Sequence, residues 1–217
     1  MTEINQTNYG IRLVVAAFGI LCGLTGIIAG FFEVLQGNVA TNGIEVSYIG
    51  PNYSMANDFT YFAITIVPNF LVTGILAIIV SSLVIVWSVS FVHRPYGATI
   101  LLVLSVTQML VGGGWVIDLA IIMCILATRI GKPLTWWRSK FPESVFKTLA
   151  KTFSLSLIMY SVIASGMLIL SIIGVNNMAL LGNMSTLATL MFIPILLMIL
   201  GGISHQIQST SLVHYSS

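Results

Sequence analysis

Five long apolar stretches dominate the chain, and more polar segments separate them. The stretches cover 11–37, 61–92, 97–128, 152–175 and 184–204. A helix that crosses a bilayer needs about 20 mostly apolar residues. We therefore predict single spanning helices at 11–37, 68–92, 152–175 and 184–204. The second span is expected to begin at Pro68, because proline suits the first turn of a helix and disfavours its interior.

The third stretch, 97–128, is too long for one span. At about 1.5 Å per residue a continuous helix would be about 48 Å long, whereas the hydrocarbon core of a bilayer is about 30 Å thick. Its centre is Gly112-Gly113-Gly114, and each glycine in a helix interior costs about 1 kcal/mol. We therefore predict two short helical arms that meet at these glycines.

The positions of the basic residues favour a hairpin over a further span. The chain has eight of them: Arg12, Arg94, Arg129, Lys132, Arg138, Lys140, Lys147 and Lys151. If 97–128 enters and leaves on one side, all eight lie on that side. If it crosses, Arg12 and Arg94 are separated from the rest, and the positive-inside rule favours the first arrangement. We predict an all-α integral membrane protein, one membrane domain over 1–217, with four transmembrane helices around a re-entrant helical hairpin. Five to six spanning helices are the alternative.

Two loops complete this topology. The segment 38–60 has no lysine or arginine and is predicted to lie outside, with a short extended segment within 43–51. The segment 129–151 is basic and is predicted to lie inside. It contains a predicted membrane anchor, in which tryptophans and basic side chains face lipid headgroups. The anchor residues are Trp136, Trp137, Arg138 and Lys140. The protein is thus expected in the plasma membrane as a multi-pass protein with both termini cytoplasmic.

Composition excludes several classes of protein. Of 217 residues, 57% are hydrophobic and 6% are charged, whereas a soluble domain carries about 25% charged residues. Two cysteines and a net charge of +2 are not typical of a disulfide scaffold or a nucleic-acid-binding protein. We expect membrane lipids as partners, a homo-oligomer or a larger membrane complex as the assembly, and neither a cofactor nor a metal.

Small residues form a stripe on the first helix. Gly19, Gly23, Gly26 and Gly30 recur at spacings of four and three, which places them on one helix face. Small side chains let membrane helices approach closely. The stripe predicts a tight helix–helix contact, and it places Glu33, the next residue in the series, on the packed face.

Two acids lie within the apolar stretches, and they are the main candidates for chemistry. Glu33 is expected near the outer end of the first helix, and Asp118 follows the glycines in the first turn of the second arm. A buried carboxylate without a partner takes up a proton or binds a cation, so intramembrane acids are functional candidates. Asp118 could instead cap its helix. Gln108 is close enough in sequence to bond the glycines.

Several segments together resemble a set of uncharacterised prokaryotic multi-span membrane proteins. The segments are 31–38 (FFEVLQGN), 49–51 (IGP), 66–70 (IVPNF), 111–114 (VGGG), 127–130 (ATRI) and 133–138 (PLTWWR). The resemblance covers roughly residues 30–138. It implies a bacterial or archaeal cell-membrane setting and brings no assigned activity.

Three functions fit these features. The leading hypothesis is a channel- or carrier-like protein for a cation or proton, with a pathway that uses Gly112, Gly113, Gly114, Asp118, Glu33 and Gln108. One alternative is a non-catalytic membrane subunit or assembly factor, in which the hairpin and the glycine stripe serve packing. The other is an intramembrane enzyme acting on a lipid or quinone. We favour a non-enzymatic role, since no nucleophile–base pair, phosphate loop or dinucleotide motif is visible.

Overall fold

The computed structural model describes residues 9–41, 43–47, 62–114, 117–130, 142–173 and 192–207. Within these ranges the chain is mostly helical. It divides into two compact units, one of Phe18–Thr128 and one of Met1–Ala17 with Arg129–Ser217. Helix α2 (Tyr9–Leu35) begins in the second of these units and continues into the first.

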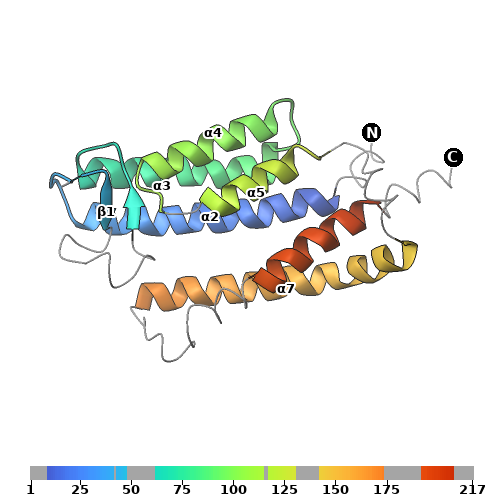
Figure 1. Cartoon of the computed structure of the whole chain (residues 1–217). Helices are drawn as coiled ribbons and strands as arrows, with labels where there is room; N and C mark the ends of the chain where they lie inside the picture. The colour runs from blue at the N-terminus through green and yellow to red at the C-terminus, as the bar shows by residue number, and fades with distance from the viewer. Residues whose placement is uncertain are drawn as a thin grey trace. The chain divides into compact units, whose positions relative to one another are not determined.

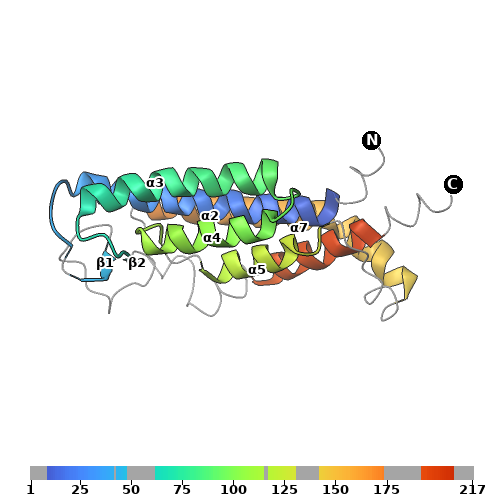
Figure 2. The same ribbon diagram turned by 90° about the horizontal axis from the view of Figure 1, so that it is seen from above.

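Helices α2 and α3 form a closely packed pair in the unit Phe18–Thr128 (Figures 1 and 2). Helix α3 (Phe70–Val86) continues as one π-helical segment, η2 (Trp87–Phe91). The first turn of α3 is capped by Asn69, whose side chain accepts a hydrogen bond from the Val72 N–H at 3.2 Å. The proline expected to open this helix therefore lies just before the cap rather than within the helix.

Two helices in the described part of the chain are long and apolar enough to cross a membrane, Gly10–Leu35 and Phe70–Phe91. Two shorter apolar helices, Gly97–Leu110 and Phe192–Ile207, accompany them. These helices support the predicted all-α class and a membrane protein at the level of composition. The number of spans, and the side of the membrane on which each loop and terminus lies, stay predictions.

A small antiparallel sheet covers the end of α2. Strand β1 (Glu45–Ser47) pairs with strand β2 (Phe62–Ile64), with Val46 opposite Ala63. Val46 and Ala63 pack with Ala29 and Phe70 in one apolar cluster. The extended segment predicted within 43–51 thus contains β1, whereas β2 lies in a stretch that we had not predicted to be a strand.

The third apolar stretch is interrupted where the sequence predicted. Helix α4 (Gly97–Leu110) ends before the three glycines, and helix α5 (Ile117–Ala127) begins after them. Gly112 and Gly114 adopt positive φ angles of 88° and 80°, which glycine tolerates at little steric cost. Helix α4 packs against α3, and α5 turns back beside α4 (Figures 1 and 2).

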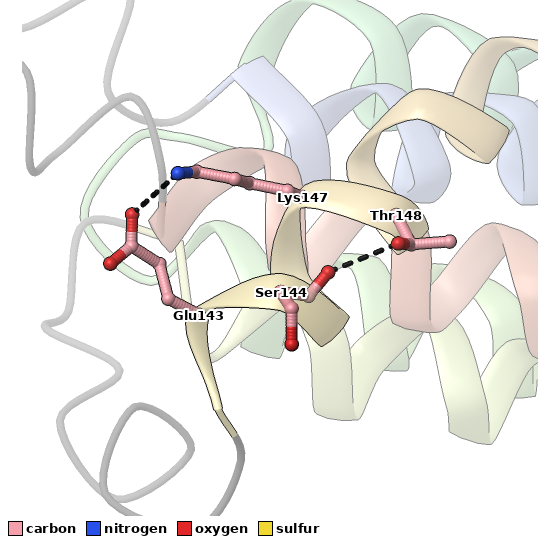
Figure 3. Close-up of polar contacts among 4 residues, drawn as sticks. All are labelled: Glu143, Ser144, Lys147 and Thr148. Carbon is pink, nitrogen blue, oxygen red and sulfur yellow. Dashed lines mark hydrogen bonds and ion pairs between the residues drawn. The ribbon is translucent and has the colours of Figure 1, made fainter.

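Helix α7 (Glu143–Ile173) belongs to the other unit and begins earlier than hydropathy indicated. We had predicted a loop up to residue 151 and a helix from residue 152. The helix instead begins at Glu143, whose carboxylate pairs with Lys147 one turn later at 2.9 Å (Figure 3). An acid in the first turn and a pair of this spacing both stabilise a helix start.

The helix Phe192–Ile207 packs through glycines in this same unit. A Cβ on Gly201 would lie 3.0 Å from the Phe153 Cα of α7, and one on Gly202 would lie 3.2 Å from the Gly10 carbonyl oxygen. The fourth predicted span, 184–204, overlaps this helix, and its first part lies outside the described residues.

Candidate functional site

The centre of the candidate site is Glu33, in the last turn of α2. Its side chain is fully buried, with 0% exposure, and neither carboxylate oxygen has a hydrogen-bond partner. The turn that follows fixes the end of the helix, because the Gly37 N–H donates to the Val34 carbonyl and Gly37 takes a φ of +79°. Glu33 is therefore held on a helix end that is locally well defined.

The Glu33 carboxyl group lies directly against Gly112. A Cβ placed on Gly112 would lie 2.8 Å from the Glu33 Cδ and would also collide with both carboxylate oxygens. Only glycine can occupy this position without displacing the acid. We call residues 111–114, which include Gly112, the glycine tip. The structure thus brings together two residues that the sequence placed in a predicted ion pathway, although 79 positions separate them.

A short bridge of backbone hydrogen bonds fixes the glycine tip to the segment that follows β2. Thr65 pairs with Val111 as an antiparallel bridge. On either side, the Ile66 N–H donates to the Leu110 carbonyl and the Gly112 N–H donates to the Ile64 carbonyl, both at 2.9 Å. The N–H groups of Val111, Gly112 and Gly113 therefore all donate to backbone carbonyl groups of the protein.

Two threonines reinforce this bridge from inside. The Thr73 hydroxyl donates to the Val111 carbonyl at 2.7 Å, so the hydrogen bond of 2.6 Å between the two threonine hydroxyls is donated by Thr65. Thr65 in turn accepts from the Val67 N–H at 3.1 Å. Both side chains are buried, with exposures of 1% and 0%. We call Thr65 and Thr73 the threonine latch, because they join α3 to the glycine tip.

Gln108 supports the other side of the tip. Its Nε2 donates to the Cys22 carbonyl of α2 at 2.7 Å and lies 3.4 Å from the Gly113 carbonyl. Its side chain is fully buried, and its Oε1 has no hydrogen-bond partner. Gly113 packs against Gln108, whereas a Cβ added to Gly114 would lie 3.8 Å from the Thr25 Cγ2 and 4.0 Å from the Ala29 Cβ of α2. The three glycines therefore have three different surroundings.

The glycine stripe on α2 faces α3 in the described structure. A Cβ on Gly23 would lie 2.8 Å from the Ser81 carbonyl oxygen, and one on Gly30 would lie 2.6 Å from the Gly74 carbonyl oxygen. A Cβ on Gly19 would collide with Ser88, and one on Gly26 with Ser81 and Gln108. The stripe thus lets the α2 backbone approach α3 closely, as small residues do in packed helices.

Buried polar side chains continue along the inside of α3 and α4. We call them the polar row, and each is at most 2% exposed: Thr73, Ser81, Ser88, Ser105 and Gln108. The Ser81 hydroxyl has no hydrogen-bond partner. At about 1.5 Å per residue, Ser81 lies about 12 Å from Thr73 along α3, and Ser88 lies about 10 Å further. Along α3 and η2 the polar row therefore consists of single polar side chains that are separated from one another.

Few charged groups approach Glu33 from the elements around it. Helices α3 and α4 and strand β2 contain no acidic, basic or histidine residue. Strand β1 contributes Glu45, whose side chain is exposed. Among the described residues no group of three or more histidines, cysteines or acids could hold a metal ion. Both cysteines, Cys22 and Cys124, are buried and free.

Other predicted site residues lie outside the described side chains. Asp118 is the second residue of α5, as the predicted helix start implies, but its side chain is outside the described structure. The predicted anchor, Trp136, Trp137, Arg138 and Lys140, also lies outside the described residues. The sequence analysis missed the threonine latch, because a threonine within an apolar stretch gives no distinct signal. The only available hint to this threonine pair was that Thr73 lies near the predicted start of the span, five residues after Pro68.

No protein-family model, curated protein or solved structure matches this chain. The resemblance to prokaryotic multi-span membrane proteins therefore remains a prediction. The site itself offers one buried carboxyl group, a glycine tip packed on that group, and separate polar groups along the adjoining helices.

Proposed function

We propose that this protein is a small channel- or carrier-like membrane protein that moves a proton or another small cation, with Glu33 and the glycine tip as its ion site. One observation carries the proposal: Glu33 is fully buried, its oxygens have no partner, and Gly112 lies directly against them. An isolated carboxylate is costly to bury unless it binds a proton or a cation. An acid kept in such a place is thus a functional candidate.

The proposal includes the predicted topology, with four spans, both termini cytoplasmic and a re-entrant hairpin formed by α4 and α5. The Trp87 indole donates to the Gly97 carbonyl at 3.0 Å, so α4 begins beside the end of α3. The bridge from Thr65 to Val111 holds the end of α4 beside the start of α3. If α3 spans the membrane, α4 returns towards the outer surface, and α5 leads back again. Glu33 then lies near the outer mouth.

The polar row supports a pathway from this mouth towards the inner surface. Ser81 and Gln108 are the middle points, where one hydroxyl and one amide oxygen are buried without partners. Ordered water commonly occupies such places when the surroundings are polar enough. The apolar residues Ala77 and Val84 lie between the polar points of α3, so passage requires water between them. This arrangement suits a controlled pathway more than an open pore.

Ion flux in liposomes tests the proposed function. Purified protein is reconstituted, and uptake of protons, sodium and potassium is measured separately under an imposed gradient. We expect flux of one cation above that of empty liposomes, and we expect Glu33→Gln to reduce it to the empty-liposome level. Glu45→Gln is the matched control, because it removes the same charge from an exposed strand position. Absence of flux for every cation, or equal flux in both variants, would contradict the proposal.

A non-catalytic membrane subunit is the second candidate function, and the fixed glycine tip favours it. The bridge, the threonine latch and the packed glycine stripe all hold the hairpin in place, as a packing element would require. In that case the liposomes stay tight to all three cations. Unfolding of the protein in detergent would still respond to changes at Gly112 and in the glycine stripe.

A further inference from the structure

The number of groups that could bind a ligand together with Glu33 limits which kind of ligand the site can take. A metal cation such as Ca²⁺ or Mg²⁺ takes six or more oxygen ligands. Among the described side chains, one carboxyl group lies at Gly112. The two threonine hydroxyls at the adjoining bridge are engaged, because Thr73 donates to the Val111 carbonyl and Thr65 donates to Thr73. The unpartnered Gln108 Oε1 adds a single further oxygen.

The packing around the Glu33 carboxyl group also disfavours a bound metal cation. Gly112 occupies the space beside both oxygens so closely that a methyl group would not fit. Ala29, one helical turn before Glu33 on α2, belongs to an apolar cluster with Val46, Ala63 and Phe70, and Phe32 packs against this cluster. A cation with a partial shell of water needs room that this packing does not leave. A proton needs one oxygen and no added volume.

The charges that face Glu33 are few. Helices α3 and α4 and strand β2 carry no titratable acid, base or histidine. Glu45 of β1 is exposed, and neither oxygen of Glu33 has a hydrogen-bond partner among the described residues. Asp118 of α5 is the other acid of this unit, and its side chain is outside the described structure. A neutral carboxylic acid is therefore the form of Glu33 that suits its described surroundings.

We propose that the Glu33 site binds a proton rather than a metal cation, and that the glycine tip packs on the protonated carboxyl group. This inference rests on the proposed function for its physiological meaning, but its structural content is independent of transport. Binding joins a proton from water to one carboxylate oxygen, and release returns the proton to water. No other bond changes. Release leaves a charged oxygen against Gly112, so we infer that the tip moves or admits water when the proton leaves.

Infrared spectroscopy tests this directly, because a protonated carboxyl group has a carbonyl stretch that a carboxylate lacks. The full chain is prepared with ¹³C at the glutamate carboxyl carbons, which separates glutamates from Asp58 and Asp118. Glu3, Glu45 and Glu143 are replaced by Gln, so that Glu33 is the only glutamate. We expect the labelled carboxylic band at neutral pH, its loss as pH rises, and no change when sodium, potassium or calcium is added at constant pH.

Two results would overturn the inference. One is the labelled carboxylate bands alone across the whole pH range in which the protein stays folded. The other is loss of the carboxylic band on adding one of the three metal cations at constant pH. The outcome is separable from that of the flux assay. A carboxylic band without flux rejects transport and keeps the proton site, whereas flux of sodium or potassium without the band rejects the proton site alone.

Discussion

At the residue scale, the contact between Glu33 and Gly112 determines what the site can do. Gly112 is needed for two separate reasons, its φ of +88° and the absence of a side chain beside the carboxyl group. Gly114 shares only the first reason, since its φ is +80° and the atoms nearest to an added Cβ would be 3.8 and 4.0 Å from it. A comparison of alanine substitutions at the two glycines therefore separates the cost of backbone strain from the cost of a clash with Glu33.

We expect Gly112→Ala to destabilise the protein more than Gly114→Ala. Both substitutions carry the strain of a left-handed residue, about 1–2 kcal/mol. Only the first adds a clash with a packed neighbour, about 1–3 kcal/mol more. Thermal unfolding in detergent compares them. Glu33→Ala in the Gly112→Ala background should recover part of the loss. Equal destabilisation by the two alanines, with no recovery, would mean that Glu33 does not pack on the tip.

At the element scale, two contacts within the unit Phe18–Thr128 differ in how far the sequence predicts them: the glycine stripe against α3, and the bridge between the glycine tip and the segment after β2. The first followed from local spacing, since Gly19 to Gly30 occupy one helix face whatever the rest of the chain does. The second required a pairing between Thr65 and Val111. Such a pairing depends on the whole fold. The sequence therefore predicted the break at the glycines, but it did not predict which segment would pair with the glycine tip.

We expect Gly26→Ala to weaken the α2–α3 contact. The added Cβ would collide with the Ser81 hydroxyl and with Gln108 Nε2, at a cost of about 1–3 kcal/mol. Gly166→Ala is the matched control, because this helical glycine has no atom within 4 Å of an added Cβ. The control should be neutral or stabilising by up to about 1 kcal/mol, since alanine favours helices. Similar shifts in melting temperature for both variants would show that the stripe is not tightly packed.

At the scale of the whole molecule, the sequence predicted the helical class and the positions of most helices from hydropathy alone. It was less accurate where a helix extends into polar sequence. Helix α7 begins at Glu143 because an acid and the Lys147 pair stabilise its first turns, and neither effect adds to hydropathy. Strand β2 was missed because its few residues lie within an apolar stretch that resembles the start of a span. The threonine latch was missed for the same reason.

In the proposed topology, α4 and α5 form a re-entrant hairpin, which places the Glu33–Gly112 contact at one mouth of the membrane protein. Single cysteines at Pro95 and Gly131, in a background with Cys22 and Cys124 replaced by alanine, test it with a membrane-impermeant thiol reagent. Val39→Cys, before β1 and exposed, reports on the other side. We expect Pro95→Cys and Gly131→Cys to be labelled from the same side, and Val39→Cys from the opposite one. Labelling of Pro95→Cys and Gly131→Cys from opposite sides would contradict the account.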